Sequence, residues 1–100
     1  MTHARKVDVN QGDIVKALRK AGFSVLSLSG VKGGCPDLLV GGRIPGGRHG
    51  IECNILLEVK SPKREGHKQL TPDQEHFHRA WKGPIFIVRS VDEALLAVGL

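Results

Sequence analysis

The pattern of apolar and polar positions divides the chain into short segments with a helical or a strand-like period. Apolar residues recur every three or four positions over Gln11–Ala21, which predicts an amphipathic helix with Asn10 as its N-cap. Four runs rich in valine, leucine, isoleucine and phenylalanine predict strands. These runs are Phe23–Leu28, Asp37–Val40, which the pair Gly41-Gly42 is expected to end, Ile51–Lys60 and Ile85–Val88.

Two capping boxes predict where two further helices begin. Each box places a glutamine or glutamate three positions after a threonine or serine, Gln74 after Thr71 and Glu93 after Ser90. The helices are expected over residues 71–81 and 90–98. The resulting order, α-β-β-β-α-β-α, predicts an antiparallel meander of three strands, a crossover helix and a parallel fourth strand. The expected fold class is therefore α/β, with a mixed central sheet flanked by helices.

Length and charge narrow the class of protein. One hundred residues fit one domain, with a core over about residues 10–98, and the net charge of +5 favours an anionic partner, nucleic acid ahead of lipid. No apolar run approaches the ~20 residues of a membrane span, and the first ten residues lack the apolar centre of a signal peptide. We therefore expect an intracellular, cytoplasmic protein without membrane contact. Cys35 and Cys53 are interpreted as reduced thiols rather than as a disulfide or zinc ligands.

Three charged residues fall at the ends of predicted neighbouring strands. Asp37 begins the second strand, and Glu58 and Lys60 lie two apart near the end of the third, on one face. Two carboxylates and the backbone carbonyl of Val59 suit Mg²⁺, which prefers oxygen ligands, while Lys60 can orient an attacking water. This arrangement predicts phosphodiester hydrolysis. The alternative is an exposed cross-strand pair of Glu58 and Lys60 without chemistry.

Several short motifs carry a resemblance to a known family. They are Gly34–Val40, Leu56–Ser61, Leu70–Gln74 and Ser90–Ala94. In this order they resemble the PD-(D/E)XK nuclease superfamily and, more closely, the small stand-alone phage-type members of the VRR-NUC (virus-type replication-repair nuclease) family. The resemblance implies an αβββαβ restriction-endonuclease-like core, Mg²⁺ or Mn²⁺, and cleavage of DNA by homodimers, often at branched substrates such as Holliday junctions.

The resemblance also implies roles for single residues. Asp37 and Glu58 match its metal ligands, Lys60 its catalytic lysine and Gln74 its polar residue near the metal. Gln74 also shares a helix face with apolar residues, so a site role and a capping role both stay open for it. Many relatives carry glutamate where this chain has Gln11. Gln11 is therefore a possible support of the metal site, and the number of metals stays open.

Basic residues lie in the loops that flank this constellation. We expect them to form a positive rim that binds the DNA backbone, with a generally solvated basic surface as the alternative. The residues are Lys32, Arg43, Arg48, Lys63, Arg64 and Lys68. No small-molecule cofactor is expected. Two other functions stay open: a catalytically weak or inactive DNA-binding module of the same fold, and an accessory domain that binds RNA or protein.

Overall fold

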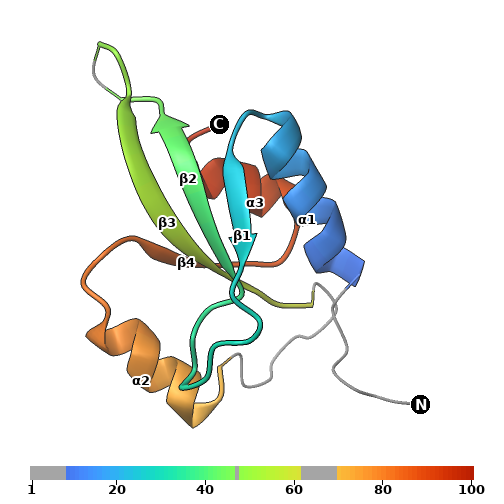
Figure 1. The fold of residues 1–100 in the computed structure, drawn as a ribbon, viewed down its shortest axis with the longest axis vertical. Coiled ribbons are helices and arrows are strands. Elements are labelled where there is room, and N and C mark those ends of the chain that lie inside the picture. Colours follow the sequence, from blue (N-terminus) through green and yellow to red (C-terminus); the bar gives the residue numbers. More distant parts are fainter. Residues whose placement is uncertain (1–8, 47, 62–69) are drawn as a thin grey trace.

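The computed structural model describes residues 9–46, 48–61 and 70–100 of the chain. It shows a small α/β fold in which three helices flank a four-stranded mixed sheet (Figure 1). The elements are α1 (Val9–Lys20), β1 (Ser24–Ser27), β2 (Leu38–Ile44), β3 (Ile51–Val59), α2 (Pro72–Ala80), β4 (Ile85–Val88) and α3 (Val91–Ala97). This order is the predicted one. In this part of the chain, no helix is long and apolar enough to cross a membrane.

The sheet has the predicted topology. Its strands lie in the order β1-β2-β3-β4, with antiparallel pairing of β1 with β2 and of β2 with β3. Strand β4 pairs parallel with β3, and α2 provides the crossover between them. In the register of the central pair, Leu38 lies opposite Leu57 and Ile44 lies opposite Ile51. The loop before β2 and the end of β3 therefore meet at one end of the sheet, and the β2–β3 hairpin lies at the other.

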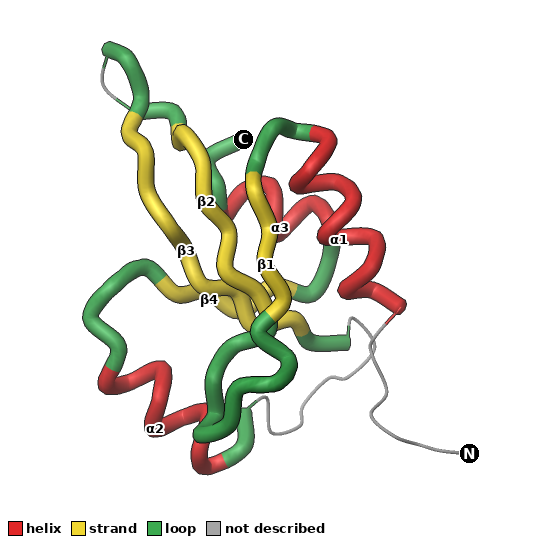
Figure 2. Tube along the Cα trace, in the orientation of Figure 1, coloured by secondary structure: helices red, strands yellow, loops and turns green. Residues whose placement is uncertain are grey.

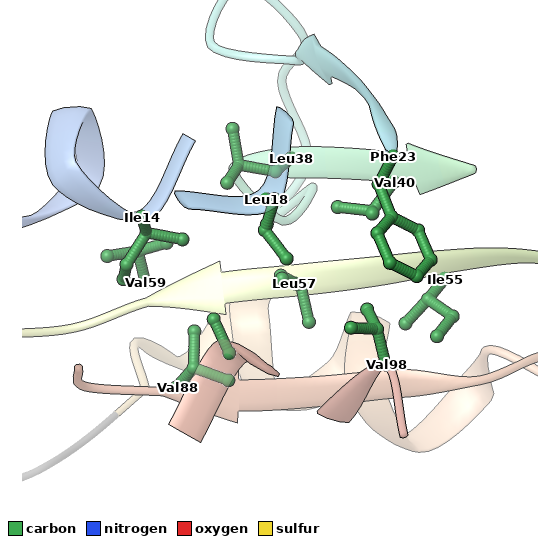
Figure 3. Close-up of a cluster of buried hydrophobic side chains, with 11 residues drawn as sticks. Ile14, Leu18, Phe23, Leu38, Val40, Ile55, Leu57, Val59, Val88 and Val98 are labelled. Atoms are coloured by element: carbon green, nitrogen blue, oxygen red, sulfur yellow. The ribbon is translucent and has the colours of Figure 1, made fainter. Parts of the chain in front are cut away.

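The hydrophobic core lies between one face of the sheet and the helices α1 and α3 (Figure 3). Alternate residues of β3 point into it, so Ile55, Leu57 and Val59 pack against Ile14 of α1 and Val98 of α3, among others. The intervening residues of β3 point to the opposite face, where α2 lies (Figure 1). Glu58 is one of these residues, so the alternation directs its carboxylate away from the apolar core.

Two element boundaries differ from the prediction. Strand β2 does not end at the pair Gly41-Gly42 but continues to Ile44. A Cβ at Gly42 would lie 2.5 Å from the Phe23 ring, so the glycine serves to make room for that side chain and not to form a turn. Asn10 lies inside α1 and not at its N-cap. Its Nδ2 donates to the carbonyls of Lys60 and Arg89, at 3.1 and 3.0 Å, and joins the helix to the ends of β3 and β4.

The capping boxes are confirmed in full for α2 and in half for α3. Thr71 accepts from the Gln74 backbone N–H while the Gln74 side chain accepts from the Thr71 N–H. Ser90 accepts from the Glu93 N–H at 3.1 Å, but the Glu93 carboxylate accepts from the backbone N–H of Arg89, one residue earlier than predicted, at 2.7 Å. The long loop between β1 and β2 runs beside the start of α2 (Figure 2). It brings α2 to the end of the sheet where Asp37 lies.

Candidate functional site

Asp37 joins the loop before β2 to the end of β3. Its backbone carbonyl accepts from Leu28 N–H at 2.8 Å, which ties the loop closed just after β1. Its carboxylate oxygen Oδ2 accepts from the backbone N–H of Val59 at 2.8 Å. Asp37 was predicted to begin the strand, but β2 begins one residue later, at Leu38. The Asp37 side chain provides the acceptor for the Val59 N–H that a backbone carbonyl would provide within the sheet.

Glu58 is the buried acid of the site. It is 2% exposed, and it is the only buried polar or charged residue in the described part of the chain. Its Oε2 accepts from Gln74 Nε2 at 3.2 Å and lies 3.5 Å from Lys60 Nζ. Its Oε1 is buried and has no hydrogen-bond partner among the residues that the structure describes. A carboxylate held in this way retains one oxygen for a ligand.

Gln74 connects α2 to these two side chains. Its Oε1 accepts from Lys60 Nζ and from Thr71 N–H, both at 3.0 Å, while its Nε2 donates to Glu58. The sequence leaves open whether Gln74 caps α2 or lies beside Glu58. The structure shows that its side chain does both. The start of α2 and the charged cluster share a single hydrogen-bond network.

Gly34 sets how closely the preceding loop approaches α2. Its φ is +80°, and a Cβ there would collide with the carbonyl oxygen of Asp73 and lie 2.8 Å from Gln74 N. Gly33 has a similar φ of +83°, but open space surrounds the place of its Cβ. Of these two glycines, Gly34 is required by packing as well as by conformation, and its close approach to the start of α2 positions Gln74.

The cluster of Asp37, Glu58 and Lys60 contains more acidic than basic groups. Burial, followed by the neighbouring charge of Asp37, raises the pKa of Glu58 to about 7, against a smaller lowering by the Lys60 ammonium. Burial, followed by the charges of Glu58 and Asp37, also raises the pKa of the half-buried Cys35 thiol. One ammonium does not offset two carboxylates, so a cation entering here would stabilise the ionised form of Glu58.

The donor set at this end of the sheet fits a hard cation. No group of three histidine, cysteine, aspartate or glutamate residues within residues 9–46, 48–61 and 70–100 could hold a metal ion. Asp37 and Glu58 supply two carboxylates, and Val59 adds a backbone carbonyl. The N–H and C=O of one strand residue point the same way, so the Val59 carbonyl lies on the side of β3 to which its N–H binds Asp37. Mg²⁺ is commonly bound through one or two carboxylates and several waters.

Comparisons of the chain with protein-family models, with curated proteins and with solved structures gave no match. The chemistry of the site therefore has to be inferred from its own residues and geometry.

The structure does not bring all the predicted basic residues together. Lys32 is exposed in the loop that leads to Asp37. Arg43 and Arg48 are exposed at the β2–β3 hairpin, where Arg43 pairs with Glu52 at 3.0 Å. The hairpin is separated from Asp37 by the length of β2, about 20 Å at ~3.3 Å per residue, so the predicted rim does not include it (Figure 1). Lys63, Arg64 and Lys68 lie outside the described residues.

Gln11 is half-buried on α1 and makes no hydrogen bond to Asp37, Glu58 or Lys60 in the described part of the chain. The neighbouring Asn10 makes the link between α1 and the end of β3 instead. His78 is a residue of the cluster that the sequence reasoning missed. Its Nε2 is buried and has no hydrogen-bond partner within the described part of the chain, and burial together with the Lys60 charge lowers its pKa. Its spacing of four from Gln74, which places both on one face of a helix, is the signal that could have revealed it.

Proposed function

We propose that the protein is a metal-dependent nuclease of the PD-(D/E)XK type that hydrolyses phosphodiester bonds in DNA, with a core like that of the VRR-NUC family. The observation that carries the proposal is the convergence of Asp37, Lys60 and Gln74 on the buried Glu58, whose Oε1 has no hydrogen-bond partner among the described residues. Burial of such a group costs free energy unless a ligand or cation completes it.

Each side chain of the cluster has a role in this proposal. Asp37, Glu58 and the Val59 carbonyl would hold Mg²⁺ or Mn²⁺, which when bound would lower the pKa of a water ligand and stabilise charge on the phosphate. Lys60 orients the attacking water from the same face of β3. Gln74 holds both the Lys60 ammonium and the Glu58 carboxylate, and so fixes their separation.

DNA is the proposed substrate because the net charge is +5 in spite of the acidic cluster. Lys32 is exposed in the loop that leads to Asp37 and would contact a phosphate near the scissile bond. The hairpin arginines, about 20 Å from Asp37, would be reached only by a duplex that extends about six base pairs from the site. A homodimer acting on branched DNA inside the cell is proposed from the family resemblance, since two sites related by a twofold axis suit a twofold substrate.

Cleavage of supercoiled plasmid and of a four-way junction, with Mg²⁺ or Mn²⁺ and with chelator, tests the proposal. Asp37→Ala and Lys60→Ala are expected to lower the rate about 10²- to 10⁴-fold. Lys82→Ala, at an exposed lysine after α2, is the matched control and should cut like the native protein. No metal-dependent cutting by the native protein, or equal cutting by the site variants, would contradict the nuclease; junction binding without cutting would favour the inactive DNA-binding module.

The proposed DNA contact has its own test. Binding of a junction is measured against salt concentration for Lys32→Ala and for Arg48→Ala. Loss of a phosphate contact near the site should weaken binding and lower the salt slope by about one for Lys32→Ala. An equal effect of Arg48→Ala would show that the substrate extends to the hairpin.

A further inference from the structure

Two buried side-chain atoms in the described part of the chain have no hydrogen-bond partner, Glu58 Oε1 and His78 Nε2. The first belongs to the carboxylate pair already assigned to the cation. The second is not used by the proposed mechanism. A buried nitrogen without a partner costs about 1–3 kcal/mol, so its presence next to a charged cluster calls for a physical reason.

The position of His78 on α2 points to Lys60. His78 follows Gln74 by four residues, so the two side chains lie on one face of the helix, one turn apart. Gln74 Oε1 accepts from Lys60 Nζ at 3.0 Å. Burial lowers the pKa of His78, and the charge of Lys60 lowers it further. The ring is therefore neutral at neutral pH and lies within the field of the lysine.

The hydrogen-bonding capacities of the two groups match. An ammonium has three N–H donors, and Lys60 directs one to Gln74 and lies 3.5 Å from Glu58 Oε2. This leaves a donor without a protein acceptor in the described residues. A neutral imidazole has one acceptor nitrogen. His78 Nδ1 is not among the buried unpaired atoms, so it can carry the ring hydrogen and leave the Nε2 lone pair free.

We propose that His78 is a positioning residue for Lys60, and that its Nε2 accepts a hydrogen bond from the ammonium when Glu58 turns to another partner. The catalytic consequence rests on the nuclease function proposed above. A Glu58 carboxylate engaged elsewhere attracts Lys60 less, and Gln74 and His78 then hold the ammonium from successive turns of α2. Two acceptors restrict the position of Nζ, whereas Gln74 alone leaves the lysine free to rotate about that bond.

The ring tautomer, measured by ¹⁵N NMR without metal on the Glu58→Gln variant, in which no carboxylate at this position attracts Lys60, is the first test. We expect His78 to carry its hydrogen on Nδ1, the opposite of the tautomer that free histidine favours in water. Lys60→Met should then shift the Nε2 resonance, while that of His76, exposed on the same helix, should stay in place. A hydrogen on Nε2 in Glu58→Gln, or an Nε2 resonance that Lys60→Met leaves unchanged in that background, would overturn the proposal.

Kinetics with matched variants is the second test. His78→Gln retains an acceptor, His78→Leu has none, and His76→Leu is the surface control; urea unfolding verifies that each is folded. His78→Leu should lower kcat about 10- to 100-fold at unchanged KM, and His78→Gln should recover most of that loss. Equal losses in both His78 variants would refute the positioning role. A native protein that cuts no DNA would refute the nuclease instead, and the NMR result would still decide whether His78 contacts Lys60.

Discussion

Replacing Glu58 by glutamine should stabilise the folded protein, although Glu58 lies at the centre of the site. Burial and the Asp37 charge raise the pKa of Glu58 from its ordinary 4.5 to about 7. Between these two pH values the folded protein keeps the proton while the unfolded chain has lost it, so stability falls as the pH rises through this interval and levels off above it. At ~1.4 kcal/mol per pH unit, the cost above pH 7 is about 3 kcal/mol.

Glutamine is neutral at every pH and has the shape of the protonated acid, so it does not carry this cost. Its carbonyl can accept from Gln74 as Glu58 Oε2 does. We expect Glu58→Gln to be more stable than the native protein by about 1 kcal/mol at pH 5 and about 3 kcal/mol at pH 8. Urea unfolding with chelator, followed by circular dichroism, measures both values.

The matched control is Glu75→Gln, at an exposed glutamate on the same helix, which should change stability by less than about 0.5 kcal/mol. Added Mg²⁺ should stabilise the native protein and leave Glu58→Gln unchanged, because the cation binds the folded carboxylate. A Glu58→Gln variant less stable than the native protein at pH 8, or a difference independent of pH, would refute the assignment of a destabilising buried charge.

Three further outcomes are expected in the same unfolding assay. Gly33→Ala should cost about 1 kcal/mol for its positive φ, and Gly34→Ala about 1–3 kcal/mol more, because only its Cβ meets the backbone at the start of α2; equal costs would refute that close approach. Asn10→Ala should cost about 1–2 kcal/mol, and Asn10→Asp more, because a carboxylate would face two carbonyl oxygens; a milder aspartate would contradict the donor role. Gln74→Glu should match the native stability at pH 5, since glutamate retains the helix cap. At pH 8 its free energy of unfolding should be lower than that of the native protein by about 1–2 kcal/mol, because its charge repels Glu58; a loss independent of pH would argue against that contact.

The elements of the fold could be predicted because their signals are local. The 3.6-residue period of α1, the capping box at Thr71 and the alternation along β3 each depend on neighbours in sequence. The end of β2 was predicted wrongly for a non-local reason. From sequence alone the pair Gly41-Gly42 indicates a turn, whereas in the structure Gly42 makes room for the ring of Phe23, which is distant in sequence. Asn10 is a similar case, because its partners, the carbonyls of Lys60 and Arg89, are distant in sequence.

The part of the candidate site that depends on which strands are neighbours could be predicted from the sequence. Asp37 and Glu58 were expected at one edge because a meander makes their strands neighbours, and the register places them there. The same meander sends successive loops to alternate ends of the sheet, which is why the hairpin with Arg43 and Arg48 lies away from the acids. The contribution of His78 depends on how α2 lies against the sheet, and no strand rule predicts that.

The seating of α2 shows how the fold and the site depend on each other. Gln74, Phe77 and His78 are half-buried and no residue of α2 is fully buried, so burial contributes less to holding this helix in place than it does for α1 and α3. Its position depends on the Gly34 contact and on Gln74, which joins the Thr71 cap to Lys60 and Glu58. A helix held mainly by polar contacts can move when those contacts change, whereas α1 and α3 are fixed by the apolar core. A cation or phosphate that alters the charge on Glu58 would therefore act directly on the contacts that position α2, and binding at the site would be coupled to the placement of this helix.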